Sequence, residues 1–148
     1  NVIAIAAGIV VGLGLGHSAL ASMMTRGLNE MTRLGVALGA KPLTFQGLSG
    51  LGDLILTCTS DLSRNRTMGL QLAMGKKREE ILGSRTAVTE GVATAEAVHK
   101  LAGQFGVELP ICEEVYQILY HNKPCIEGVK TLASRALKEE TEGIKGPF

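Results

Sequence analysis

Hydrophobic residues recur at three- and four-residue steps along most of this chain, which is the spacing of an amphipathic α-helix. The pattern is clearest between residues 18 and 38, where polar side chains fill the other faces. The apolar positions of this stretch are Leu20, Met24, Leu28, Met31, Leu34 and Leu38, and the polar ones are Arg26, Asn29, Glu30 and Arg33. Gly39 and then Pro42 interrupt the pattern, so we expect one long helix that ends there.

Shorter helices are predicted along the rest of the chain. The periodicity, and the glycines and prolines that bound it, place them over 65–74, 76–82, 94–105, 111–120 and 126–137. In the helix that ends before Gly106, Thr94 is the expected N-cap and Phe105 is expected to point inward. Residues 87–91 are expected to be irregular or extended.

No stretch reads convincingly as a β-strand, so the predicted fold class is all-α, with roughly seven or eight helices. The domain is expected to cover residues 1–137. Residues 138–148 are charged and glycine-rich, and we expect them to form a flexible tail.

The first apolar stretch allows two interpretations. Residues 2–24 carry no fully charged side chain and are long enough to cross a bilayer, and Gly8, Gly12 and Gly16 have the spacing that packs membrane helices closely. One alternative is therefore a small membrane or helix-packing protein built on residues 2–24. A buried helix that breaks between Gly12 and Gly16 fits equally well, because the stretch has many glycines and no flanking aromatic belt.

The same glycines do not form a dinucleotide-binding loop. That loop requires the pattern G-x-G-x-x-G. Starting from Gly12, the last position is His17, and starting from Gly14, it is Ala19. The chain therefore contains no nucleotide-binding fingerprint of its own.

Net charge limits the classes of partner. The chain of 148 residues has a net charge of +1, with two tyrosines, three phenylalanines and no tryptophan. A nucleic-acid binder would have to use the basic residues Arg64, Arg66, Lys76, Lys77 and Arg78. The near-neutral charge and the scarcity of aromatic residues argue against that hypothesis, so we predict no nucleic-acid partner.

Cysteines and histidines suggest no metal site. Cys58, Cys112 and Cys125 are odd in number and far apart, which favours buried thiols, a reducing compartment and a cytoplasmic protein. No two histidines have the spacing of metal ligands. We expect His99 and His121 to be solvated and His17 to be buried between helices.

The start of the chain is not a signal peptide, because Asn1 leads directly into apolar sequence without a basic region. We interpret it as a chain cut in the middle of a larger protein.

Candidate chemistry is concentrated between residues 47 and 66. Glycines at 47, 50 and 52 precede Asp53, and one helical turn would place Asp53 and Thr57 on the same face, with the carboxylate among apolar residues. Ser63 is a plausible N-cap, with Arg64 and Arg66 directly after it. A helix start with adjacent arginines is an anion site of phosphate size. A glycine-rich turn followed by a solvated cap is an equally open interpretation of the same residues.

Several motifs resemble one enzyme family. They are Asn-Val-Ile-Ala-Ile-Ala-Ala-Gly at 1–8, Gly-Leu-Gly-Asp-Leu-Ile-Leu-Thr-Cys-Thr at 50–59, Ser-Arg-Asn-Arg at 63–66, Thr-Glu-Gly at 89–91 and Leu-Pro-Ile at 109–111. In order and spacing they resemble the C-terminal half of bacterial-type NAD(P)-dependent glycerol-3-phosphate dehydrogenase. The resemblance runs from residue 1 to about residue 136.

The resemblance implies an all-α domain like the C-terminal domain of 6-phosphogluconate dehydrogenase, preceded in the family by a Rossmann domain that is absent here. The family interconverts sn-glycerol 3-phosphate and dihydroxyacetone phosphate by hydride transfer with NAD or NADP, and so feeds phospholipid synthesis. Its catalytic lysine stands directly before the residue matching Asn1, so the fragment alone is expected to be inactive. A homodimer is possible, and the missing domain decides between NAD and NADP.

The resemblance also implies roles for individual residues. Asp53 and Thr57 match catalytic positions, where the carboxylate would hold and tune the lysine. The matched substrate-binding residues are Asn1, Asp53, Ser63, Arg64 and Asn65, and the matched cofactor-binding residues are Arg64, Val88 and Glu90.

Overall fold

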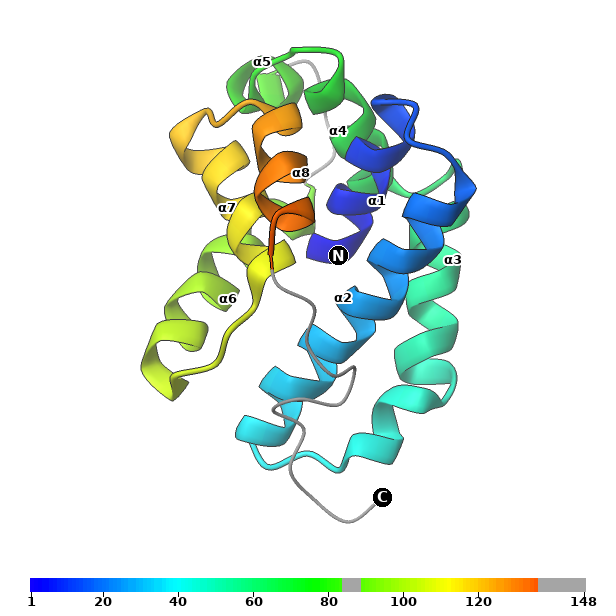
Figure 1. Cartoon of the computed structure of the whole chain (residues 1–148), viewed down its shortest axis with the longest axis vertical. Helices are drawn as coiled ribbons and strands as arrows, with labels where there is room; N and C mark the ends of the chain where they lie inside the picture. Colours follow the sequence, from blue (N-terminus) through cyan, green and yellow to red (C-terminus); the bar gives the residue numbers. More distant parts are fainter. Residues whose placement is uncertain (84–88, 136–148) are drawn as a thin grey trace.

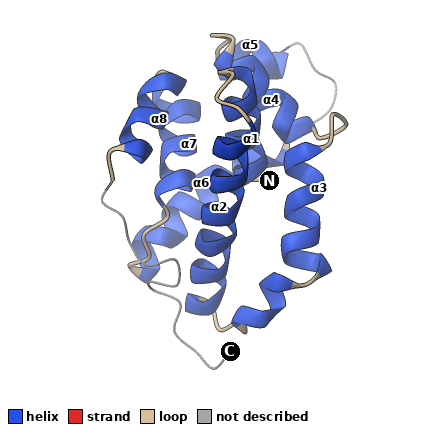
Figure 2. Cartoon of the chain, turned by 45° about the vertical axis from the view of Figure 1, so that its right-hand side comes forward, coloured by secondary structure: helices blue, strands red, loops and turns tan. Residues whose placement is uncertain are grey.

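The fold was analysed in a computed structural model that describes residues 1–83 and 89–135. Within these ranges every regular element is helical, and no strand is present (Figure 2), which confirms the predicted all-α class. The α-helices are α1 (Val2–Gly12), α2 (His17–Ala37), α3 (Asp53–Thr59), α4 (Arg64–Ala73), α5 (Arg78–Gly83), α6 (Glu90–Phe105), α7 (Pro110–His121) and α8 (Cys125–Ala133). A 3-10 helix, η1 (Pro42–Gln46), and a π-helical turn, η2 (Leu48–Gly52), connect α2 to α3.

Helix α1 forms the centre of the molecule. All of its residues from Val2 to Val10 are buried, because they are apolar or glycine on every face of the helix. Figure 1 shows α1 in the interior, with α2 and α3 on one side and α6, α7 and α8 on the other. The start of α1 is therefore reached by several helices at once.

Glycines allow α1 and α4 to approach closely. A Cβ atom added to Gly8 would lie 2.0 Å from the carbonyl oxygen of Arg66, and one added to Gly69 would lie 2.0 Å from that of Ile5. At Gly12 it would lie 2.6 Å from the Cβ atom of Ala73. Gly8 and Gly12, two of the three glycines whose spacing suggested membrane packing, therefore serve a contact between two helices of one domain.

The apolar stretch over residues 2–24 is not one helix. It breaks after Gly12, where Gly14 and Gly16 adopt φ angles of +67° and +86° that favour glycine. No helix within the described ranges is both long enough and apolar enough to cross a membrane. The interpretation as a buried helix that breaks near Gly12 is confirmed, and the alternative of a single span has no support.

Three helix ends that were predicted from local signals are confirmed. The Ser63 side chain accepts a hydrogen bond from the backbone N–H of Arg66 at 3.2 Å, so it is the N-cap of α4. Gly106 ends α6 in the left-handed conformation, and Pro110 is in the first turn of α7.

The predicted start of α6 is wrong. The helix begins at Glu90 with Thr89 as its N-cap, so Glu90 and Gly91 are helical rather than extended. Thr94 lies inside the helix, where its hydroxyl donates to the carbonyl oxygen of Glu90 at 2.8 Å. Phe105 is exposed instead of inward-facing. Residues 84–88, the predicted helix end at Leu137 and the predicted tail over 138–148 lie outside the described residues.

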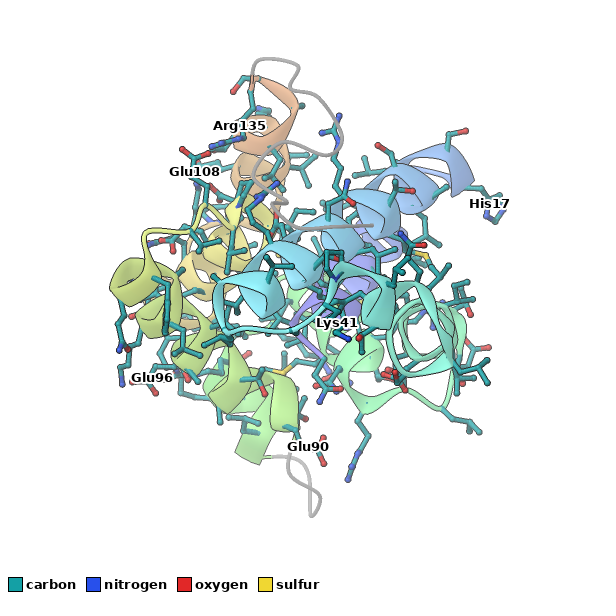
Figure 3. All side chains as sticks on the ribbon, turned by 90° about the horizontal axis from the view of Figure 1, so that it is seen from below. His17, Lys41, Glu90, Glu96, Glu108 and Arg135 are labelled. Atoms are coloured by element: carbon teal, nitrogen blue, oxygen red, sulfur yellow. The ribbon has the colours of Figure 1, made fainter. Side chains whose placement is uncertain are left out.

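Two of the three histidines also differ from expectation. His17 is exposed at the start of α2 and points away from the body of the molecule (Figure 3). His99 is not simply solvated, because its Nδ1 atom lies 2.6 Å from Glu113 and its ring stacks on Tyr116. His121 is exposed, as predicted.

The cysteines are buried and unpaired, as predicted. Burial raises the pKa of the Cys58 and Cys125 thiols to about 11 and raises that of Cys112 as well. All three are therefore protonated and poorly nucleophilic at neutral pH.

Glu30 is the main polar residue that periodicity misplaces. It was assigned to a polar face of α2, yet its side chain is buried with the residue only 3% exposed. Its two oxygens accept hydrogen bonds from the backbone N–H groups of Ile111 at 2.7 Å and Cys112 at 3.1 Å, in the first turn of α7. Because Leu109 provides no side-chain cap for α7, Glu30 caps it from another helix.

Candidate functional site

Three helices begin at one place, and the side chain of Asn65 joins them. Asn65 is the second residue of α4 and is buried. Its Nδ2 atom donates to Oδ1 of Asn1, the N-cap of α1, at 2.9 Å. Its Oδ1 atom accepts from the backbone N–H of Gly91, in the first turn of α6, also at 2.9 Å. The starts of α1, α4 and α6 therefore meet, and each helix start carries partial positive charge.

Gly91 is required for this meeting. A Cβ atom at this position would lie 2.5 Å from Oδ1 of Asn65 and 2.8 Å from Cδ1 of Ile5. Only glycine allows the first turn of α6 to come so close to α1 and α4. Close packing of the three helices thus explains the glycine of the Thr-Glu-Gly motif.

Arg64 and Glu90 face each other across this junction. Arg64 is the first residue of α4 and Glu90 is the first residue of α6. The Nη2 atom of Arg64 lies 2.6 Å from the Oε1 atom of Glu90, and their side chains are 50% and 49% exposed. Figure 3 shows Glu90 at the end of its helix, at the edge of the molecule. Two residues that are 26 positions apart in sequence form one accessible charged pair.

Thr89 supplies an unsatisfied polar group at the same helix start. The residue is 1% exposed, and its hydroxyl oxygen has no hydrogen-bond partner in the part of the chain that the structure describes. It does not cap α6 with its side chain. Nearly all buried polar groups in folded proteins have a hydrogen-bond partner, so this hydroxyl is an exception.

Asp53 and Thr57 lie one helical turn apart on α3, as predicted. The Thr57 hydroxyl donates to the backbone oxygen of Asp53 at 2.9 Å. Asp53 is exposed, so the expectation that its carboxylate is enclosed by apolar residues is wrong. Helix α3, which carries both residues, packs against α1 and α4.

Arg66 does not contribute to the exposed cationic group. Its guanidinium pairs with Asp61 at 2.8 Å, and its side chain is only 12% exposed. It supports the turn between α3 and α4 instead of facing solvent. Among the basic residues of the Ser-Arg-Asn-Arg motif, Arg64 is thus the accessible one.

The structure brings most of the sequence-predicted residues together. Asn1, Asn65, Arg64 and Glu90 surround one junction, and Ser63 caps the helix that presents Arg64. Val88 lies outside the described residues. Sequence reasoning missed the unsatisfied hydroxyl of Thr89, for which no local pattern gives a signal.

A family comparison matches the chain over residues 1–130. The matching family is the C-terminus of NAD-dependent glycerol-3-phosphate dehydrogenase. The chain belongs to this family. The motifs at 1–8, 50–59, 63–66, 89–91 and 109–111 all fall within the matched range.

Relatives of the family are similar over nearly the whole chain. The NAD(P)+ glycerol-3-phosphate dehydrogenase of Geobacter sulfurreducens is 57% identical over 140 residues, which cover 95% of this chain and 42% of that protein. The enzyme of the same name from Geobacter metallireducens is 58% identical over the same coverage. The chain therefore spans about two fifths of the length of these relatives.

Solved structures of the family share the fold. The glycerol-3-phosphate dehydrogenase of Coxiella burnetii superposes with a TM-score of 0.87 at 42% identity, covering 90% of this chain and 41% of that one. The yeast enzyme from Saccharomyces cerevisiae superposes with a TM-score of 0.79 at 31% identity, covering 88% and 39%. The all-α architecture is thus the C-terminal domain of this family.

Proposed function

We propose that this chain is the substrate-binding part of an NAD(P)-dependent enzyme that interconverts sn-glycerol 3-phosphate and dihydroxyacetone phosphate. The observation that carries the proposal is the junction at Asn65, where three helix starts and the Arg64 guanidinium concentrate positive charge. A phosphate dianion is the ligand that such a site favours. The names of the relatives supply the particular phosphate ester.

Arg64 is the residue that we assign to the phosphate group. Its planar fork of N–H donors matches phosphate oxygens, and its half-exposed side chain is accessible to a ligand. Ser63 and Asn65 hold the first turn of α4 in place, and Asn1 is held through Asn65. These residues would fix the substrate at one end and leave its reacting carbon free.

Asp53 and Thr57 are assigned to the other end of the substrate. Both lie on α3, which packs against α1, and the family resemblance places the catalytic lysine directly before the start of α1. A carboxylate at this position would hold the ammonium group in place and tune its pKa for proton transfer to the developing alkoxide. The Thr57 hydroxyl keeps acceptor capacity for a substrate hydroxyl while it donates to Asp53.

The residues at the junction fit a nicotinamide cofactor. The Arg64 guanidinium is an anion ligand, and the side chains of Arg64 and Glu90 are accessible. We propose that Arg64, Val88 and Glu90 contact NAD or NADP, which supplies the hydride and is bound mainly by a Rossmann domain.

Exposed leucines support a partner surface on η2, α3 and the turn that follows. Leu48, Leu56 and Leu62 are 91%, 63% and 92% exposed. Exposed apolar side chains along one segment are typical of a surface that another part of the protein covers. We propose the Rossmann domain as that part, and self-association of the isolated chain through the same face. A monomer at all concentrations in sedimentation would contradict the self-association.

We also propose a cytoplasmic location and a role in supplying glycerol 3-phosphate for phospholipid synthesis. The three free, buried cysteines support a reducing compartment. The phospholipid role rests on the family resemblance alone.

A chimera tests the proposed function. The part of the Geobacter sulfurreducens enzyme that precedes the matched region would be joined to this chain at Asn1. We expect the chimera to oxidise NADH or NADPH in the presence of dihydroxyacetone phosphate, and the Asp53→Asn variant to be strongly impaired. A folded chimera that binds cofactor but has no activity with this substrate would contradict the proposal.

A further inference from the structure

The Arg64–Glu90 pair occupies the place where an anionic ligand would bind. The carboxylate oxygen of Glu90 lies 2.6 Å from the Arg64 guanidinium, which is the distance of a charge-assisted hydrogen bond. Both side chains are half exposed, so neither is confined by packing. A phosphate that binds Arg64 must compete with a carboxylate that is already there.

We propose that Glu90 is a resident counter-ion that determines how tightly the site holds phosphate. This inference rests on the proposed function, because it concerns the same anion site. In the absence of ligand, Glu90 neutralises Arg64 at the junction of the three helix starts. A phosphate displaces the carboxylate, and the affinity of the site is the difference between two ion pairs.

The local structure explains why the exchange is easy. An exposed ion pair contributes only a factor of about five or less to an equilibrium, because water screens it and two long side chains must be ordered. Glu90 is also the first residue of α6, so its side chain can leave Arg64 while Gly91 remains bonded to Asn65.

The packing also confines the exchange to one charged pair. Arg66 is paired with Asp61 and is largely buried, so it does not substitute for Arg64. Asn65 is held by Asn1 and Gly91, so the backbone positions of Arg64 and Glu90 stay fixed when the pair opens. Removing the charge of Glu90 should therefore change the affinity for phosphate without moving the site.

The test is the binding of inorganic phosphate to the chain itself. NMR chemical shifts would be followed during a phosphate titration at constant ionic strength set with sodium chloride. The variants are Glu90→Gln, Arg64→Ala and the double variant. Glu96→Gln is the matched control, because Glu96 lies on the same helix, is similarly exposed and pairs with Lys100 at 2.7 Å.

We expect Glu90→Gln to bind phosphate about two- to fivefold more tightly than the unaltered chain, since an exposed competing charge has been removed. Glu96→Gln should bind as the unaltered chain does. Arg64→Ala, alone or with Glu90→Gln, should bind at least about tenfold more weakly than Glu90→Gln.

Two outcomes separate this inference from the proposed function. If Glu90→Gln binds no more tightly than the unaltered chain while Arg64→Ala abolishes binding, the counter-ion role is wrong and the phosphate site stands. If Arg64→Ala leaves phosphate binding unchanged, the phosphate site itself is wrong, and both proposals fail together.

Discussion

Two glutamate side chains lie at the start of a helix, but their environments differ. Glu30 caps α7 from within the core, where both of its oxygens accept backbone N–H groups at 2.7 and 3.1 Å. Glu90 begins α6 at the surface, where it pairs with Arg64 and remains half exposed. The first carboxylate completes the fold, because backbone donors of α7 depend on it. The Glu90 carboxylate pairs with the Arg64 guanidinium, and the fold does not depend on this pair. The carboxylate therefore remains available for exchange with a ligand.

The difference shows that, in this helical domain, the residues that stabilise the fold are separate from those that are available to bind a ligand. Around Glu30 and along the contact of α1 with α4, every close approach is fixed by backbone atoms and buried side chains. At the junction of α1, α4 and α6, the positions of the helices are fixed by Asn65, but the charges projecting from it are not enclosed. We expect substitutions in the first region to change stability and substitutions in the second to change binding.

The largest expected effect is the loss of the Glu30 carboxylate. Glu30→Ala leaves two buried N–H groups of α7 without an acceptor and opens a cavity, so we expect the free energy of unfolding to fall by about 3 kcal/mol. Urea denaturation followed by circular dichroism measures it. Glu90→Ala is the control at an exposed glutamate. If Glu30→Ala lost no more stability than Glu90→Ala, the proposed difference between the two glutamates would be wrong.

The next effect concerns ligand binding at the other junction. Arg64→Ala removes a charge-assisted contact, so transition-state and substrate binding should weaken by about 2–3 kcal/mol in the intact enzyme or the chimera. Steady-state kinetics with dihydroxyacetone phosphate should show this as a raised KM, with the urea denaturation curve nearly unchanged. An unaltered KM would refute the assignment of Arg64 to the phosphate.

These two regions also differ in how far the sequence predicts them. The long α2, the Ser63 cap and the ends at Gly106 and Pro110 follow from local spacing and residue type, and the structure confirms them. Glu30 was misplaced because the periodicity of α2 cannot register the start of α7, which is 81 residues away in sequence. Its burial follows from the tertiary contact alone.

The site shows the same limit. A local motif identifies Arg64 beside a helix start, and the family resemblance identifies Glu90, yet neither predicts that the two side chains pair. The helical start of α6 at Glu90 was missed because Thr94 is also a good N-cap residue by type. What selects Glu90 is the bond between Asn65 and the N–H of Gly91, and this bond exists only when α1, α4 and α6 are assembled.

A smaller effect is the pH dependence of the contribution that Glu30 makes to stability. Burial raises the pKa of Glu30 above its ordinary value of 4.5, and this outweighs the opposing effect of the two backbone N–H donors. A carboxyl group with a raised pKa binds its proton more tightly in the folded state. Its contribution to stability is therefore present at low pH and is lost as the pH rises from 4.5 through the folded-state pKa.

The comparison of the unaltered chain with Glu30→Gln isolates this contribution. As the pH rises from about 4 to about 7, the unaltered chain should lose stability relative to Glu30→Gln. The difference in their free energies of unfolding should change by at most about 1.4 kcal/mol per pH unit. Urea denaturation at several pH values measures the slope. A difference that is constant with pH, or that shifts in the opposite direction, would show that the pKa of Glu30 is not raised in the folded chain.

The smallest expected effect is the change in stability on neutralising Glu90. Glu90→Gln removes one charge from a half-exposed pair, which water screens, so the free energy of unfolding should change by no more than about 1 kcal/mol. Differential scanning calorimetry of Glu90→Gln measures this change, and Glu96→Gln is the control. A loss near that of Glu30→Ala would mean that the ion pair holds α6 against α4. Phosphate could then displace Glu90 only by loosening the fold, whereas a negligible loss leaves the carboxylate free to exchange with a ligand while Asn65 keeps the helices in place.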